Sequence, residues 1–193
     1  MKYRSILLFG APGAGKGTQG KILGVIPNFF HCACGDVFRN LRADSSLGKI
    51  FIDYSGRGQL VPDEPTIELW RQFIHNSTKI GRFHPGQDTL VLDGIPRNVR
   101  QAEILRDTLD VTAVFFLKSK NEEKLVERIQ RRAIKENRLD DANLGVIRDR
   151  LRVYENETKP VLNFYGRKAV HNINADQSPG KVLADILRHA VKK

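Results

Sequence analysis

The segment GAPGAGKGTQ, residues 10–19, constrains the fold of this chain more than any other stretch. It follows the short apolar run at residues 3–9 and precedes a segment with a helical pattern. Gly10, Gly15 and Lys16 have the spacing of the two glycines and the lysine of a P-loop. Glycines let backbone N–H groups close around an anion, and the positive end of the following helix points at the same place. The segment therefore predicts a phosphate-binding loop between a strand and a helix.

Short apolar runs alternate with longer helical patterns along the rest of the chain. Strands are predicted at residues 4–9, 29–33, 89–93, 112–117 and 169–173. Helices are predicted at residues 15–24, 36–43, 63–76, 98–109, 121–133, 141–164 and 180–191. The alternation predicts an α/β fold with a five-stranded parallel sheet flanked by helices. Ligands bind such sheets beyond the carboxyl ends of the strands, where Gly10, Asp93 and Gly94 fall.

The size and composition of the chain are those of one globular domain. Its 193 residues are 40% hydrophobic and 28% charged, which fits a single domain spanning residues 1–193. No run approaches the roughly 20 apolar residues that cross a bilayer. The apolar residues 6–9 before the glycines are too short for a signal-peptide core. We expect a cytoplasmic protein that does not associate with a membrane.

The formal net charge of +10 raises the possibility of an anionic partner. Nucleic acid is the usual partner of clustered Lys and Arg. Here the basic residues are scattered among acids, as in NEEKLVERIQRR at residues 121–132, and only 8% of residues are aromatic. We therefore expect no nucleic acid, and a small polyphosphate ligand accounts for part of the surplus charge.

Several polar residues, in the loop and after it, are suited to phosphate chemistry. Lys16 can hold the outer phosphates of a nucleotide, although Gly17 stands where many P-loops carry Ser or Thr and the hydroxyl comes at Thr18. Asp93 ends an apolar strand and is predicted to hold magnesium through water; its alternative role is a turn or capping residue before Gly94. Arginines can bind phosphate oxygens through two hydrogen bonds. The candidates are Arg39, Arg97, Arg128, Arg132, Arg138 and Arg150.

Seven segments, in order along the chain, resemble those of adenylate kinases. They are GAPGAGKGTQ (10–19), CGDVFR (34–39), GQLVPDE (58–64), LDGIPRNVRQA (92–102), ERIQRR (127–132), RLDD (138–141) and RLRVYENETKPV (150–161). The resemblance covers essentially the whole chain and implies a P-loop kinase fold. It also implies that residues 34–62 form a nucleoside-monophosphate-binding flap and residues 132–140 a lid of the short form.

The resemblance also implies a role for individual residues. On the ATP side it implies Gly13, Ala14, Gly15, Lys16, Gly17, Thr18, Arg128, Arg132 and Gln177. On the AMP side it implies Cys34, Arg39, Gln59, Leu60, Val61, Gly94, Ile95, Pro96, Arg97, Gln101, Arg138 and Arg150. The residues that would act on the transferred phosphoryl group are Lys16, Arg132, Arg138 and Arg150.

The reaction implied by the resemblance is reversible transfer of the γ-phosphoryl group of MgATP to AMP, giving two ADP, by a monomer. A UMP/CMP kinase on the same scaffold is the main alternative, and a slow P-loop ATPase that binds nucleic acid is a more distant one. A guanine-nucleotide switch would need an Asn-Lys-x-Asp string, which the sequence lacks.

The sequence departs from the family pattern at three places. Ile95 stands where Phe or Tyr is usual, and Cys34 stands where Thr is usual. One extra residue precedes Arg150, so Arg148 could take its phosphate role, although RLRVY favours Arg150. Neither the cysteine spacing nor the lid, which has no Cys or His, offers a zinc site, so magnesium is the only metal expected.

Overall fold

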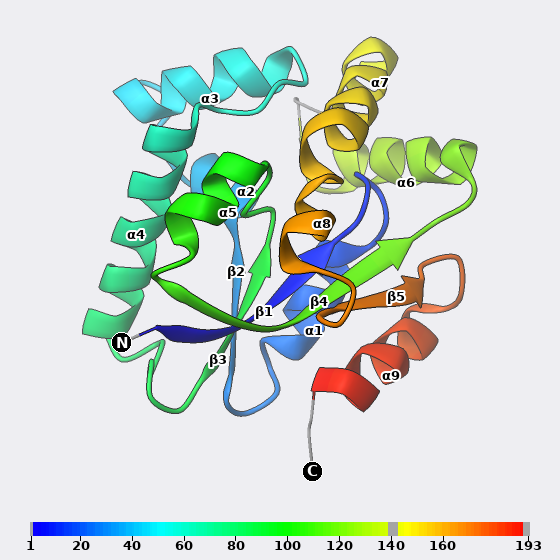
Figure 1. The fold of residues 1–193 in the computed structure, drawn as a ribbon. Coiled ribbons are helices and arrows are strands. Elements are labelled where there is room, and N and C mark those ends of the chain that lie inside the picture. The colour runs from blue at the N-terminus through cyan, green and yellow to red at the C-terminus, as the bar shows by residue number, and fades with distance from the viewer. Residues whose placement is uncertain (1, 139–142, 191–193) are drawn as a thin grey trace.

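A five-stranded parallel sheet forms the centre of the protein in a computed structural model that describes residues 2–138 and 143–190 (Figure 1). The strands are β1 (Tyr3–Phe9), β2 (Phe29–Ala33), β3 (Thr89–Asp93), β4 (Leu109–Lys118) and β5 (Val170–Asn174). Their order is β2-β3-β1-β4-β5, and every neighbouring pair is parallel. The predicted α/β fold and five-stranded parallel sheet are confirmed.

Helices cover both faces of this sheet (Figure 1). They are α1 (Lys16–Leu23), α2 (Cys34–Arg39), α3 (Ser46–Gly56), α4 (Asp63–Lys79), α5 (Val99–Leu105), α6 (Glu122–Lys135), α7 (Leu144–Val153), the π-helix η2 (Tyr154–Thr158), α8 (Val161–Tyr165) and α9 (Pro179–Ala190). Helices α1 and α9 pack against one face, while α4, α5 and α8 contribute to the core on the other.

The central strand β1 is buried on both faces, as the parallel topology requires. Ile6 and Leu8 belong to the core cluster under α1 and α9, whereas Leu7 and Phe9 belong to the cluster under α4 and α5. Alternate side chains of a strand point to opposite faces, so a continuous apolar run fills two cores at once. This double burial fixes the position of the strand and of the loop that follows it.

Three predicted helices differ from the structure by more than a shift of one to three residues at an end. The segment 141–164 is divided into α7, η2 and α8 over its described part, since Pro160 has no N–H to continue the helix from residue 156. The helix predicted at 98–109 ends at Leu105, and β4 already begins at Leu109. The helix predicted at 36–43 is α2, which starts and ends earlier.

The two segments predicted to be a flap and a lid are helical over most of their described length. Residues 34–62 contain α2 and α3, and residues 132–135 are the last turn of α6. Residues 139–140 of the predicted lid lie outside the described residues. In Figure 1, α3 and α7 lie at the same end of the molecule, above the sheet.

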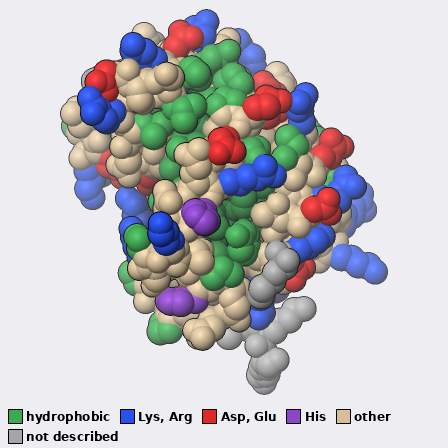
Figure 2. Space-filling model, turned by 90° about the vertical axis from the view of Figure 1, so that its left-hand side faces the viewer, with side chains coloured by type: hydrophobic (Ala, Val, Ile, Leu, Met, Phe, Trp, Pro, Cys, Tyr) green, Lys and Arg blue, Asp and Glu red, His purple; other side chains and the backbone are tan. Residues whose placement is uncertain are grey.

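Charged residues are distributed over the surface without separation by sign on the face drawn in Figure 2, where basic and acidic side chains are interspersed. Ion pairs between neighbours on one helix contribute to this pattern, such as Arg57 with Asp53 on α3 and Arg152 with Asp149 on α7. Within residues 2–138 and 143–190, no helix has the length and apolarity needed to cross a bilayer.

Candidate active site

The loop between β1 and α1 has the backbone shape of a phosphate cradle. Gly13 has φ +82°, and a Cβ there would lie 2.6 Å from the carbonyl oxygen of Leu125. Gly15 has φ +95° and precedes the first residue of α1, and a Cβ there would meet open space. Only glycine adopts both conformations without strain. The loop therefore closes against α6 on one side and leaves room for an anion on the other.

Lys16, the first residue of α1, extends back over this loop. Its Nζ donates to the carbonyl oxygen of Gly10 at 2.7 Å and to that of Ala11 at 3.2 Å. These two bonds hold the ammonium at the mouth of the loop, where the N–H groups of α1 also point. The lysine and the helix end present positive charge to the same space.

The surroundings of Lys16 are strongly cationic. The pKa of Lys16 is lowered from 10.5 to about 8, mainly by burial of the ammonium; attraction to Asp93 opposes this shift, and repulsion from nearby arginines adds to it. The arginines are Arg97, Arg132 and Arg150, which come from the loop after β3, from α6 and from α7. Three separate elements therefore bring positive charge to one lysine, which is the arrangement needed to bind a polyphosphate.

Asp93 lies at the carboxyl end of β3, beside the phosphate loop. It is in register with Leu8 of β1 and with Ala33 of β2. Its Oδ2 would be 3.6 Å from a Cβ at Gly17, so no side chain separates the carboxylate from the start of α1. A carboxylate oxygen is a hard donor, and one such group beside bound phosphates fits Mg²⁺, which keeps several of its waters. Asp93 is therefore placed to hold magnesium through water.

A single cavity of about 1030 Å³ connects these features. It is lined by the residues predicted on the ATP side and by nearly all those predicted on the AMP side. The lining includes Gly13, Ala14, Gly15, Lys16, Gly17, Thr18, Arg128, Arg132, Gln177, Cys34, Arg39, Gln59, Leu60, Val61, Asp93, Gly94, Pro96, Arg97, Gln101, Arg138 and Arg150. Ile95 is the exception among the described residues, since its side chain is 1% exposed within the core under α4 and α5.

Two of the predicted phosphate-binding arginines share one carboxylate. Arg39 donates from Nη1 to Oδ1 of Asp36 at 2.8 Å, and Arg138 contacts the same oxygen through Nη2 at 3.2 Å. Arg138 also pairs with Glu136 at 2.6 Å. Asp36 thus holds arginines from α2 and from the end of the α6 segment at one edge of the cavity, in a position that a phosphate would suit.

Arg150 rather than Arg148 faces the cavity. Arg150 lines it and is close enough to Lys16 to lower the lysine's pKa. Arg148 lies two residues earlier on α7 and is exposed to solvent. Residues two apart point in different directions on a helix, so only one of the pair can reach the site. The geometry therefore favours Arg150, while its contact with phosphate stays a prediction.

Side chains on the ATP side of the cavity are held by the loop after β5. Arg128 donates to the carbonyl oxygen of Ala175 from both Nη1 and Nη2, at 3.2 and 3.3 Å. Gln177 donates from Nε2 to Asp185 on α9 at 2.5 Å. With these side chains fixed, the backbone of this loop and the guanidinium of Arg128 form one wall of the cavity.

Cys34 lies at the start of α2 and lines the cavity, although it is only 3% exposed. Burial raises the pKa of its thiol to about 11, opposed by Arg97, so the group is a neutral thiol at physiological pH. Burial raises the pKa of the Cys32 thiol as well. A neutral thiol is a weak hydrogen-bond donor and acceptor, so Cys34 offers a ligand less than a hydroxyl would.

Gln101, which was predicted to bind AMP, is buried in the wall of the cavity. It is 1% exposed, and its Oε1 accepts from the backbone N–H of Arg97 at 2.7 Å. Its Nε2 donates to Oδ1 of Asp63, the first residue of α4, at 2.8 Å. Sequence reasoning identified Gln101 but missed Asp63, which lies 38 positions away and outside the predicted site.

Sequence reasoning also missed Asp36 and Tyr154. Asp36 stands inside the CGDVFR segment, where an acid three residues before a predicted phosphate-binding arginine is the signal that could have found it. Tyr154, in η2, lines the cavity with its hydroxyl buried and without a hydrogen-bond partner among the described residues. No sequence pattern marked Tyr154, because its position depends on the helix irregularity.

Comparisons with known proteins agree with the site geometry. The model of the family described as "Adenylate kinase" matches residues 8–170. The chain belongs to the adenylate kinase family. Among curated adenylate kinases, that of Flavobacterium psychrophilum is 33% identical, with 96% of this chain and 98% of the relative covered. That of Cyanothece sp. is 39% identical over 94% and 92%, and that of Parabacteroides distasonis is 35% identical over 86% of each. Membership of this family identifies the protein as a nucleotide-binding phosphotransferase, as the sequence resemblance implied.

Proposed function

We propose that the protein transfers the γ-phosphoryl group of MgATP to AMP, giving two ADP, and catalyses the reverse reaction. Family membership and the consistent naming of its relatives support this reaction. The single observation that carries the proposal for the site is the gathering of Arg97, Arg132 and Arg150 around Lys16 beside the phosphate loop. One molecule supplies all these groups, so we propose a monomer as the working unit.

In this proposal the ATP phosphates lie in the loop that contains Gly13 and Gly15. Lys16 contacts the outer phosphates, and Arg132 and Arg150 contact the phosphoryl group as it is transferred. Phosphoryl transfer passes through a loose transition state whose charge lies mainly on oxygens, so positioning and positive charge supply most of the catalysis. Arg97, Arg132 and Arg150 lie close to Lys16, so their positive charge is directed to the place where negative charge would develop during transfer.

The acceptor phosphate would bind between Arg39 and Arg97, which line the same cavity as Lys16. Arg138 would release Asp36 and turn to the phosphoryl group when both substrates are present. Its ion pair with Asp36 supports this, since a phosphate offers the guanidinium more acceptor oxygens than one carboxylate does. Gly94 and Pro96 would shape the turn that presents Arg97.

The acceptor base would lie against Gln59, Leu60 and Val61, and Gln101 would form hydrogen bonds with the polar edge of the base. All four residues line the same cavity as Cys34. The adenine of ATP would lie against the wall that Arg128 forms with the loop at Gln177. We place Cys34 beside the acceptor base as a weak contact, so the affinity for AMP depends mainly on Gln101 and the arginines.

Transfer to AMP requires no general base, because the attacking oxygen of a monophosphate is already ionised. The residues of the chain therefore have to bind, orient and exclude water. Residues 34–62 and 132–140 would close over the substrates as flap and lid, which prevents hydrolysis and strengthens each arginine contact. These segments carry Arg39, Arg132 and Arg138, so binding of the substrate phosphates to these arginines would draw the segments closed.

Magnesium would bind beside Asp93, with the carboxylate holding it through water. When bound, the ion would neutralise charge on the ATP phosphates. Asp93 faces the start of α1 without an intervening side chain, which supports this role. We propose no zinc, because the lid segment carries no Cys or His.

The reverse reaction tests this proposal without a coupled enzyme. Purified protein incubated with ADP and Mg²⁺ should form ATP and AMP in equal amounts, as measured by ion-exchange chromatography. Addition of EDTA should stop the reaction. Failure to form AMP from ADP in the presence of Mg²⁺ would refute the proposed function, and unequal yields of ATP and AMP would indicate hydrolysis instead.

A further inference from the structure

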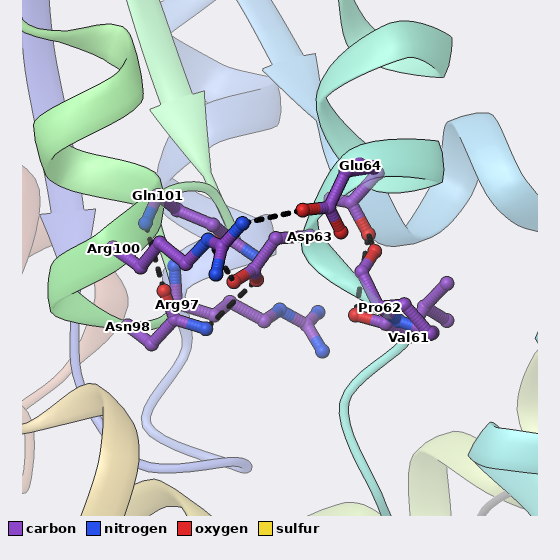
Figure 3. A network of polar contacts seen from close by, with 9 residues as sticks. Val61, Pro62, Asp63, Glu64, Arg97, Asn98, Arg100 and Gln101 are labelled. Carbon is purple, nitrogen blue, oxygen red and sulfur yellow. Dashed lines mark hydrogen bonds and ion pairs between the residues drawn. The ribbon is translucent and has the colours of Figure 1, made fainter.

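A partly buried polar network joins the start of α4 to the start of α5, next to the proposed acceptor-base pocket (Figure 3). At its centre is Asp63, whose Oδ1 accepts from Asn98 Nδ2 and from Gln101 Nε2, each at 2.8 Å. Asn98 caps α5, because its Oδ1 accepts from the backbone N–H of Gln101 at 2.8 Å. Figure 3 shows Asp63 reaching from α4 toward the two amide side chains.

The hydrogen bonds of Gln101 determine the positions of its amide oxygen and its amide nitrogen. Its oxygen meets the backbone N–H of Arg97, which can only donate, and its nitrogen meets the Asp63 carboxylate, which as an anion can only accept. If the amide were flipped, its NH2 group would face the N–H of Arg97 and its oxygen would face the carboxylate of Asp63. Gln101 is only 1% exposed, so water could not relieve these contacts. Buried polar groups left in that state are costly, so one orientation is enforced.

The fixed amide still has one N–H and one lone pair to offer a ligand, since each end is used only once. Gln101 lines the cavity, and in the proposed function these two groups meet the bound base. The edge of adenine presents a ring-nitrogen acceptor beside an amino donor, which is the complement of this pair. Uracil and guanine present a ring N–H beside a carbonyl oxygen, which is the reverse pattern. An amide that cannot flip therefore discriminates between the two classes of base.

We propose that Asp63 is a positioning residue that, together with the backbone N–H of Arg97, fixes the orientation of Gln101 and so makes the acceptor site select against UMP and GMP. The proposal rests on the role of Gln101 as reader of the acceptor base in the proposed function. Asp63 acts through Gln101 and not by touching the ligand, because the described lining of the cavity includes Gln101 but not Asp63.

The location of Asp63 suits this task. Its carboxylate lies in the first turn of α4, where the positive end of the helix favours a negative charge. Its side chain is 15% exposed, and Oδ2 lies 3.8 Å from Nε of Arg100. Glu64, the next residue, is exposed and pairs with the same arginine at 2.6 Å without contacting Gln101. The chain therefore supplies a neighbouring acid that serves as a matched control.

The test compares Asp63→Ala and Asp63→Asn with the control Glu64→Ala. Asp63→Ala removes the acceptor from Gln101, and we expect the KM for AMP to rise about tenfold while the KM for ATP stays within about twofold. The ratio of kcat/KM for AMP to that for GMP or UMP should fall by a similar factor. Asp63→Asn keeps an oxygen in place and should restore most of the AMP affinity, and Glu64→Ala should change neither KM.

A double-mutant cycle separates positioning from a general structural effect. Gln101→Met removes the amide at similar volume, and in that background Asp63→Ala should change the KM for AMP no further. An equal rise in both backgrounds, or a parallel rise in the KM for ATP, would overturn the proposal. If Asp63→Ala does not fold, Asp63→Ser, which keeps a hydroxyl acceptor, is measured in both backgrounds with the same criteria.

Failure of the proposed function has a different signature. A wild-type protein without AMP-dependent ADP formation would refute the proposed function itself. Active wild-type protein whose KM for AMP is unchanged by Gln101→Met would overturn the base-reading role and this inference with it. Active protein that responds to Gln101→Met but not to Asp63→Ala would overturn the role of Asp63 alone.

Discussion

Replacing Lys16 by Met should remove most of the catalysis and leave the fold intact. The ammonium donates to the carbonyl oxygens of Gly10 and Ala11, at 2.7 and 3.2 Å, and both bonds are lost in the variant. The same substitution removes a charge disfavoured by burial and by nearby arginines, which together lower the pKa of Lys16 from 10.5 to about 8. A pKa lowered to that value corresponds to about 3 kcal/mol against the charged form. The neutral side chain should therefore keep or raise Tm.

The loss of activity should be far larger than any change in stability. A preorganised donor to developing charge contributes about 3–4 kcal/mol, so kcat should fall by about 100- to 1000-fold. The assay is ADP formation at saturating ATP and AMP, with Tm measured by circular dichroism. Lys181→Met on the exposed side of α9 is the charge-matched control. Normal turnover combined with a lowered Tm in Lys16→Met would refute the reasoning, since it would make the lysine a structural residue.

The remaining predictions concern neighbouring residues of the cavity. Arg150→Ala should reduce kcat more than Arg148→Ala, because only Arg150 lines the cavity; a larger loss in Arg148→Ala, measured in the same ADP assay, would reverse the assignment. Cys34→Thr should lower the KM for AMP by about two- to tenfold through a better hydrogen bond, leaving the KM for ATP unchanged; an unchanged or higher KM for AMP would contradict the weak-contact role. ATP binding to wild-type protein should weaken as the pH rises through about 8, because Lys16 then loses its proton, and calorimetry in two buffers should record proton uptake on binding. The pH dependence should disappear in Lys16→Arg, and its persistence would assign the titration to another group. Metal analysis of protein purified without an affinity tag should find no stoichiometric zinc, in agreement with the absence of Cys and His from residues 132–140.

The fold was predictable because its strands are short apolar runs that bury both faces. Residues 29–33 and 89–93 form strands with the predicted bounds. The errors occurred where a helical pattern continued across a break that depends on local backbone chemistry. Pro160 divides the predicted helix 141–164, and the start of β4 at Leu109 shows that register with β1 prevailed over helix propensity.

The phosphate loop followed from local spacing alone, because all its groups lie within ten residues. The arginines were found from the order of the motifs, since no single arginine is informative without its neighbours. The partners of those residues were not predictable in the same way. Asp36 and Arg138 are 102 positions apart, and Asp63 and Gln101 are 38 apart, so their contacts arise only when the chain has folded.

The central claim is that this chain phosphorylates a monophosphate and prefers AMP. The most direct measurement is a panel in which MgATP is combined in turn with AMP, dAMP, CMP, UMP and GMP, with ADP formation followed for each. We expect ADP only when a monophosphate is added, two ADP per AMP consumed, and the highest kcat/KM for AMP. ADP formation without any monophosphate, or the highest kcat/KM for CMP or UMP, would contradict the claim.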